Sequence, residues 1–142
     1  MPSLVEDVGT HFVGLASDHE ILSNFGATQF AVNTNLFYII EPASPNNCVT
    51  IIPYAGAPAD TGHKNAQYPS FQVRIKADGV SKCYKTAQSV INELHQGDNV
   101  GSDIPMKVFA VQSSPTFLGY DEEDYPIFVT NFDVMLLKYT VS

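Results

Sequence analysis

Four histidines are the first residues in this sequence that could bind a metal ion or transfer a proton. They are His11, His19, His63 and His95, and each stands alone along the chain. Metal ligands on one helix or strand are typically spaced as H-x-x-x-H or H-x-H, and neither pattern occurs. The spacing therefore favours structural or exposed histidines, and it predicts no metal site and no cofactor.

A run of four acidic residues, Asp121 to Asp124, is the second feature that could do chemistry. Clustered carboxylates bind hard cations such as Ca²⁺. This run lacks the alternating ligands and the terminal Glu of an EF-hand loop. The sequence therefore favours a solvated hairpin turn here, and a small metal-binding module remains an alternative.

Nucleophiles are present, but none lies in a catalytic pattern. Ser113 and Ser114 stand beside Pro115, which is typical of a turn. Cys83 falls among apolar residues with helical spacing, where a small buried side chain is favoured over a reactive thiol. The sequence contains no G-x-S-x-G, no phosphate-binding loop and no G-x-G-x-x-G. We therefore predict that the protein is not an enzyme.

The composition predicts one domain spanning residues 1–142. Hydrophobic residues make up 44% of the 142 positions, which is enough to bury a core. Seven Lys and Arg against fifteen Asp and Glu give a net charge of −8, which argues against specific nucleic-acid binding. The opening residues MPSLVEDVG lack a basic region and no long apolar run follows, so we expect neither a signal peptide nor a membrane span. Two cysteines, in no C-x-x-C or Cys/His pattern, are too few for a disulfide framework, which favours a reducing cytoplasm.

Two helices are predicted from capping residues and apolar spacing. Ser3 and Glu6 form a capping-box pattern at the start of an apolar stripe that continues to Ala16. A second, amphipathic helix is expected from Val80 until Gly97 can end it. Its predicted buried stripe consists of Val80, Cys83, Tyr84, Ala87, Val90, Ile91 and Leu94.

Five runs rich in β-forming residues predict the strands. Leu36–Glu41 and Cys48–Tyr54 flank a Pro/Asn/Ser turn and are expected to pair as a hairpin. Alternating runs follow at residues 68–76, 103–112 and 126–141, the last two separated by turn residues. This order predicts an α+β fold with a mostly antiparallel sheet, flanked by the N-terminal helix and the central amphipathic helix.

The strand before the central helix carries cations on one face. Its alternation places Phe71, Val73 and Ile75 toward the core. The other face carries Gln72, Arg74 and Lys76. Because the chain has so few cations, we expect this polar face to contact a neighbouring subunit or partner protein. The alternative is that these charges only block unwanted strand pairing at a sheet edge.

A long segment rich in Gly and Pro, Ala55 to Pro69, precedes that strand. No period in it favours helix or strand, so we predict an exposed loop, and long loops in compact domains are commonly functional. The candidate partner-contact residues in the loop are Asp60, His63, Lys64 and Tyr68, and those in the acidic turn are Asp121 and Glu122.

Three stretches follow one another between Asn46 and Val134 in a distinctive order. They are NNCVTIIPYAGAPAD, then YPSFQVRIKADG leading into CYKTAQSVINEL, and finally PTFLGYDEEDYPIFVTNFDV. The most specific parts are the aromatic-Pro pair before Gln72-Val73-Arg74, the FLGYDE turn, and Asn131-Phe132 in the last strand. Together they resemble the tail terminator proteins of long-tailed bacteriophages, a group also labelled minor capsid or tail-completion proteins.

The resemblance implies a small α+β subunit that forms a homohexameric ring on the head-proximal end of the tail tube. Such a ring stops tube polymerisation and joins the tail to the neck and head. The implied partners are other copies of the chain, the tail tube protein and a neck or head-completion protein. Genomic DNA would pass through the lumen without specific binding, and no membrane is involved. The implied location is the virion tail or neck, assembled in the bacterial cytoplasm.

One residue and one turn depart from the pattern of that group. Lys76 stands where a second Arg is common, and Asp124-Tyr125-Pro126 replaces a turn that usually contains Gly and Arg. This turn therefore lacks the basic residue that the group usually carries there. Another head–tail connector, such as a stopper or head-completion protein, remains an alternative function, as does an enzyme or metal-binding module using the acidic turn.

Overall fold

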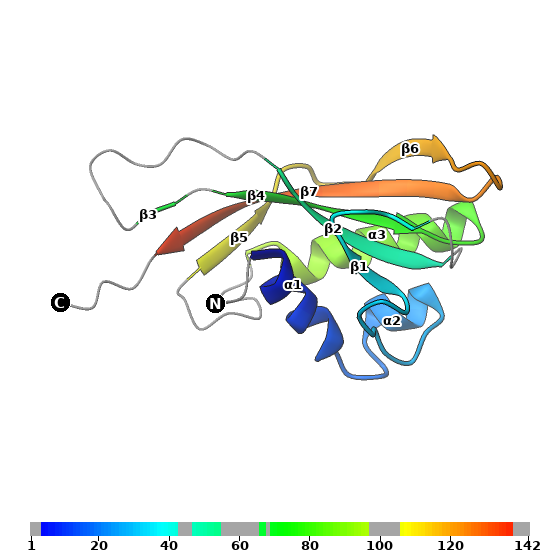
Figure 1. Cartoon of the computed structure of the whole chain (residues 1–142), viewed down its shortest axis with the longest axis horizontal. Coiled ribbons are helices and arrows are strands. Elements are labelled where there is room, and N and C mark those ends of the chain that lie inside the picture. The colour runs from blue at the N-terminus through cyan, green and yellow to red at the C-terminus, as the bar shows by residue number, and fades with distance from the viewer. Residues whose placement is uncertain (1–3, 43–46, 55–65, 68, 97–105, 138–142) are drawn as a thin grey trace.

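A computed structural model describes residues 4–42, 47–54, 66–67, 69–96 and 106–137 of the chain. That part contains three helices and seven strands (Figure 1). The helices are α1 (Leu4–Val13), α2 (Glu20–Phe25) and α3 (Val80–Leu94). The strands are β1 (Leu36–Tyr38), β2 (Cys48–Tyr54), β3 (Ala66–Gln67), β4 (Ser70–Lys76), β5 (Met106–Ala110), β6 (Thr116–Tyr120) and β7 (Pro126–Leu137).

All seven strands belong to one sheet built around the long strand β7. The order is β1-β2-β4-β7. Strand β3 pairs with β7 on the same side as β4, next to the end of β4. On its other side β7 pairs with β5 and β6, which follow one another along the same edge. Every pairing except β1 with β2 is antiparallel. The predicted α+β class with a mostly antiparallel sheet is therefore confirmed.

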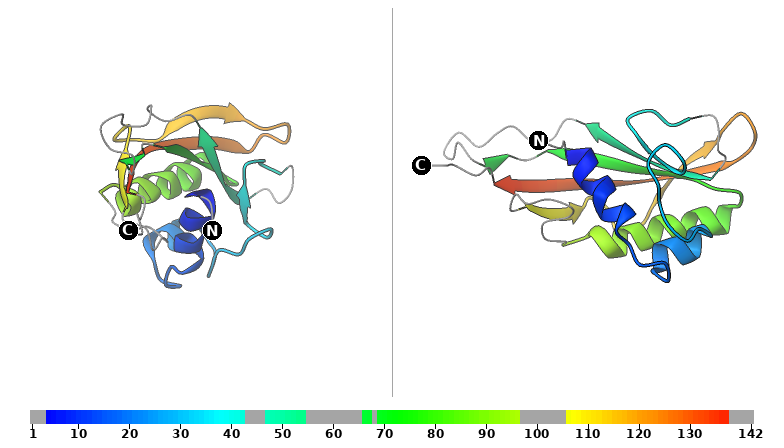
Figure 2. Two further views of the ribbon diagram at one scale, coloured as in Figure 1. Left: turned by 60° about the vertical axis from the view of Figure 1, so that its left-hand side comes forward. Right: turned by 60° about the horizontal axis from the view of Figure 1, so that its bottom comes forward.

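The three helices lie on one face of the sheet (Figure 2). Helix α3 packs on β4 and β7, α1 packs on β2, and α2 packs on α3. The core between them includes a stacked pair, Phe71 and Phe132, whose ring centroids lie 5.1 Å apart. Phe30 packs edge to face against Phe12 of α1, with the ring centroids 5.5 Å apart, and so connects the helices to the core.

Helix α3 begins where the sequence predicts, directly after Gly79, whose φ is 145°. Its buried face contains Cys83, Ala87 and Val90, with Ile91 and Leu94 further along. Two members of the predicted stripe are exposed instead, since Val80 is 48% and Tyr84 41% accessible. Both lie in the first turns of the helix, and the Tyr84 ring still packs edge to face on Phe128 of β7, with the ring centroids 5.6 Å apart. The expected cap at Gly97 lies outside the described residues.

The N-terminal helix is shorter than predicted, because α1 ends at Val13 rather than Ala16. Ser3 of the predicted capping box lies outside the described residues. Gly9 stands where the helix meets Tyr38, and a Cβ at this position would lie 2.0 Å from the Tyr38 hydroxyl. Helix α2 was not predicted. His19 caps it by accepting a hydrogen bond from the Ile21 amide at 3.1 Å.

The predicted hairpin between residues 36–41 and 48–54 is wrong, because β1 and β2 are parallel. Tyr38 lies opposite Ile51, and Leu36 opposite Val49. Ile39 adopts a φ of 74°, which turns the chain out of the sheet after only three residues of strand. The connection then leads back to the end of the sheet where β1 began. Glu41 and Pro42 of this connection lie against β4 side chains.

Two further strands lie in segments that were predicted as loops. Strand β6 occupies part of the expected turn region 113–125, and β3 lies near the end of the expected loop 55–69. Gly119 and the Pro-flanked start of β6 conceal its alternation, which a bulge between Phe117 and Gly119 also interrupts. Strand β3 has only two residues, which is too short for a periodic signal.

Candidate assembly surface

The side chains of β4 alternate between the two faces of the sheet, as the sequence predicts. Phe71, Val73 and Ile75 are fully buried toward the helices. Gln72 lies on the opposite face, where register pairs it with Ile52 of β2 and Asn131 of β7. We use the name open face for the surface formed on that side by Ile52, Tyr54, Gln72, Phe109 and Asn131.

A chain of side-chain amides crosses the open face from β4 toward β6. Gln72 Nε2 donates to Asn131 Oδ1 at 2.9 Å, and Asn131 Nδ2 donates to Gln112 Oε1 at 3.4 Å. Gln112 donates in turn to the Thr116 hydroxyl. These bonds hold the polar groups in a fixed arrangement, and they leave carbonyl and amide lone pairs and protons available to a partner.

Apolar side chains surround these amides and form a shallow pocket of about 270 Å³. Its lining is Ile52, Tyr54, Gln72, Val111 and Asn131. Tyr54 and Val111 are 41% and 54% exposed, which is high for large apolar side chains. Aromatic and aliphatic groups around fixed polar groups are typical of the centre of a protein–protein interface. This pocket can accept a side chain from another protein.

Arg74 and Lys76 do not extend the open face, because the connection from β1 to β2 covers them. Arg74 Nη2 lies 3.5 Å from Glu41 Oε2. Lys76 Nζ donates to the Pro42 carbonyl at 3.0 Å and lies 3.3 Å from Asp121 Oδ2. Lys76 is only 1% exposed. The expectation that all three polar residues of this strand face outward therefore fails at Lys76, because Pro42 and Asp121 cover its ammonium group.

The acidic run forms the turn of the β6–β7 hairpin, as predicted. Asp121 Oδ1 accepts hydrogen bonds from the amides of Tyr125 at 2.8 Å and Glu123 at 3.0 Å. These bonds, the Tyr125 bond above all, lower the pKa of Asp121 below 3.8, and Lys76 contributes further. Glu122 is exposed. Asp121 is thus held within its own chain, whereas the partner contact expected of Glu122 stays a prediction.

The remaining predicted contact residues, Asp60, His63, Lys64 and Tyr68, lie outside the described residues. Within the described ranges, no group of three His, Cys, Asp or Glu side chains is placed to hold a metal ion. No helix there combines the length and apolar character needed to cross a bilayer.

The two cysteines are buried and poorly suited to nucleophilic chemistry. Burial raises the pKa of the Cys83 thiol to about 12 and that of Cys48 to about 11. The Cys83 thiol donates to the Ile75 carbonyl at 3.0 Å. The prediction that Cys83 is a small buried side chain is confirmed, and neither thiol is poised to ionise at neutral pH.

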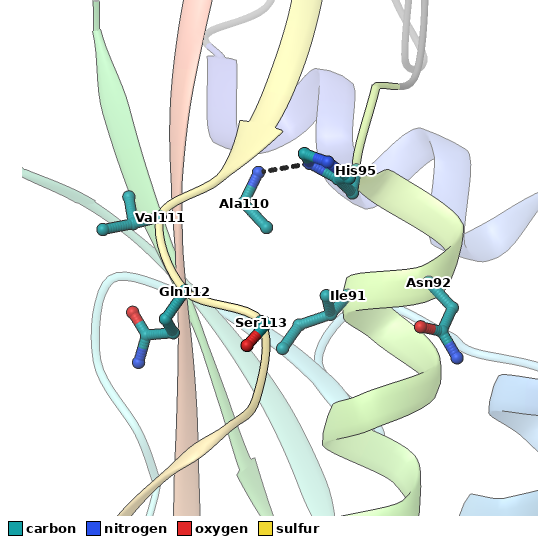
Figure 3. Close-up of a pocket in the computed structure, with 7 residues that line it drawn as sticks. All are labelled: Ile91, Asn92, His95, Ala110, Val111, Gln112 and Ser113. Carbon is teal, nitrogen blue, oxygen red and sulfur yellow. Dashed lines mark hydrogen bonds between the residues drawn. The ribbon is translucent and has the colours of Figure 1, made fainter.

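A second concavity, a groove of about 460 Å³, lies between the end of α3 and the break that separates β5 from β6 (Figure 3). Ile91 and Ser113 face each other across it (Figure 3). His95 Nδ1 accepts a hydrogen bond from the Ala110 amide at 3.0 Å. The described residues that line it are Ile91, Asn92, His95, Ala110, Val111, Gln112 and Ser113, a mixture of apolar and neutral polar side chains.

The sequence indicates Gln72 as a contact residue but does not reveal most of the open face. Asn131 and Gln112 come together with Gln72 only through the register of β7 with its two neighbours. Alternation in residues 126–135 shows which side chains share a face, but not which strand lies opposite. The sequence predicts a strand at Tyr54 but no role for it, and Val111 lies in a predicted strand, residues 103–112, that in the structure stops at Ala110.

Comparison with known proteins supports the resemblance seen in the sequence. Residues 20–138 match the family described as bacteriophage tail terminator protein. No curated protein sequence matches the chain. The fold is similar to that of a chain in a structure titled "Virion of native gene transfer agent (GTA) particle". The TM-score is 0.65 at 18% identity, over 95% of both chains. Because the family match spans most of its length, this chain belongs to the bacteriophage tail terminator family.

Proposed function

We propose that this protein ends the assembly of a phage tail. Six copies form a ring on the head-proximal end of the tail tube, stop its polymerisation and provide the surface to which the neck attaches. The observation that carries this proposal is the family match over residues 20–138. The protein acts as a structural component of the virion rather than as an enzyme, and it is assembled in the host cytoplasm.

The open face is the surface that we assign to contact with the tail tube protein. Its amides are fixed by the Gln72–Asn131–Gln112 bonds, so little side-chain entropy is lost when a partner binds. The exposed Tyr54 ring supplies apolar area beside them. Fixed polar groups give a contact its specificity, and an aromatic side chain gives it binding energy. A contact that must select one end of a tube needs both.

The charge of the chain suits a ring through which DNA moves. Each copy carries a net charge of −8, and an acidic lumen would repel phosphates and keep DNA from adhering during passage. The remaining partners are the neck or head-completion protein and the neighbouring copies in the ring. The contacts predicted for Arg74 and for the residues of segment 55–69 remain part of this proposal.

Deleting the gene from its phage tests the proposal. Without a cap, the tube should grow to abnormal lengths, and the tails should fail to join heads. Electron micrographs of lysates would show long free tails beside DNA-filled heads. Normal tails attached to normal heads would contradict the proposal, and restoring the gene on a plasmid is the control.

A second candidate is another head–tail connector. The likeness in fold favours this candidate equally, because the similar chain belongs to a whole virion particle, in which terminators and other connectors both occur. Binding separates the two candidates, since a terminator binds isolated tail tubes whereas a stopper binds heads. A gene placed directly before that of the major tail tube protein would favour the terminator.

A further inference from the structure

Two neighbouring isoleucines project from the edge of the sheet formed by β1. Ile39 and Ile40 are 58% and 76% exposed, and we call them the Ile39–Ile40 knuckle. Ile39 has a φ of 74°, in the left-handed region that a β-branched residue rarely adopts. Backbone strain of this kind tends to persist where it serves a function. Here it turns two large aliphatic side chains toward solvent.

The knuckle is held in position by backbone hydrogen bonds on both sides. The Ile39 amide donates to the Ile51 carbonyl at 2.9 Å, and the Ile40 amide donates to the Tyr38 carbonyl at 2.8 Å. The following residues, Glu41 and Pro42, are bound to Arg74 and Lys76. The two isoleucines are therefore a preformed projection rather than the tip of a free loop.

The groove between α3 and the β5–β6 break lies at the other edge of the same sheet. β1 is the first strand in the sheet order, whereas β5 and β6 lie beyond β7. The apolar part of the groove consists of Ile91, Ala110 and Val111. A projection and a concavity on opposite edges of one subunit are what a head-to-tail ring requires.

Strand addition is not available at β5, because the end of α3 occupies its outer edge. The Gln96 amide donates to the Val108 carbonyl at 2.7 Å, and His95 Nδ1 accepts from the Ala110 amide. A neighbour that meets β5 must therefore contact it through side chains that enter the groove. Short apolar side chains such as those of the knuckle meet that requirement.

We propose that the Ile39–Ile40 knuckle of one copy inserts into the α3/β5–β6 groove of the next copy. This contact rests on the ring of the proposed function and identifies the surfaces that close it. Among the described residues, neither the knuckle nor the lining of the groove carries a carboxylate or an ammonium group. Acidic chains can therefore approach one another here without placing like charges in contact.

The first test is the variant Ile40→Asp, with assembly measured by sedimentation velocity alone and on purified tail tubes. We expect the hexamer to be lost while the melting temperature of the free chain is unchanged, because Ile40 is mostly exposed. Val80→Asp, at another exposed aliphatic residue, is the matched control and should assemble like the wild type. Ser113→Trp, which fills the groove from an exposed position, should also abolish the hexamer.

The second test is rescue by opposite charge. Ser113→Lys combined with Ile40→Asp places a cation in each groove opposite the new carboxylate and should restore the hexamer. A hexamer formed normally by Ile40→Asp, or a double variant no better than Ile40→Asp alone, would overturn this contact and leave the proposed function intact. A wild-type chain that forms no ring in solution or on tubes would refute both.

Discussion

At the scale of single residues, Lys76 shows how a side chain can point away from the core of a sheet and still be buried. Its strand position places it on the face opposite the helices, but the β1–β2 connection and the β6–β7 turn both reach it. Its ammonium joins three segments that are far apart in the sequence. Position 76 therefore contributes to the fold of the subunit rather than to its exposed surface.

Asp121 should make stability depend on acid pH. Its pKa is lower in the folded chain than the unfolded value of 3.8, because the Tyr125 and Glu123 amides and Lys76 favour the carboxylate. Its contribution is thus complete above pH 3.8 and is lost as the pH falls through the folded pKa. Asp121→Asn should lower the melting temperature at pH 7 and flatten its decline below pH 4. Glu122→Gln is the neighbouring control, and equal pH profiles for Asp121→Asn and wild type would contradict the assignment.

Gly9 should be required despite its place in a helix. Alanine is favoured over glycine in helices by about 1 kcal/mol. Here a Cβ would lie 2.0 Å from the Tyr38 hydroxyl, so α1 or Tyr38 must shift. Gly9→Ala should therefore lower the free energy of unfolding measured in urea. In a Tyr38→Ala background, Gly9→Ala should no longer lower the free energy of unfolding. A Gly9→Ala variant that is more stable than the wild type would show that the contact with Tyr38 is absent.

At the scale of elements, the sequence predicts best where periodicity is long and uninterrupted. The 15 residues of α3 were predicted from spacing alone, with the correct start at Val80. The parallel β1–β2 pair was missed because adjacent β runs around a turn are usually hairpins, and the turn at Ile39 has no sequence signal. Strand β6 was missed because Gly119 and its bulge break the alternation.

The buried face of α3 gives a test at this scale. Ile91 is 5% exposed and Val80 is 48% exposed on the same helix. Ile91→Asp should cost more than about 3 kcal/mol, because it buries a charge without a partner. Val80→Asp should change the free energy of unfolding by less than about 0.5 kcal/mol. Chemical denaturation measures both, and similar values for the two variants would contradict the packing of α3.

At the scale of the whole molecule, the sequence identified the family but only part of the surface. Gln72 was a candidate from the alternation of its strand, whereas its partners Asn131 and Gln112 depend on strand register. Register is set by packing across the entire sheet, so a local pattern cannot reveal it. The covering of Lys76 depends likewise on a connection whose path follows from the parallel pair.

The open face should bind tail tubes through Tyr54. Tyr54 and Tyr84 are equally exposed, at 41%, but only Tyr54 lies on this face. Tyr54→Ala should weaken binding to isolated tubes about tenfold, which corresponds to about 1.4 kcal/mol and is typical of an aromatic anchor. Tyr84→Ala is the control and should bind as the wild type does. Equal losses for the two variants in a tube pull-down would remove the open face from the contact.

The central claim, that this chain caps a tail tube, is tested most directly by imaging tubes while they polymerise in its presence. Purified tail tube protein is assembled with and without the protein, and the tube ends are examined by cryo-electron microscopy. The account predicts a six-membered ring at one end of each tube and no further growth from that end. Tubes that keep elongating at both ends, with no ring attached, would contradict it.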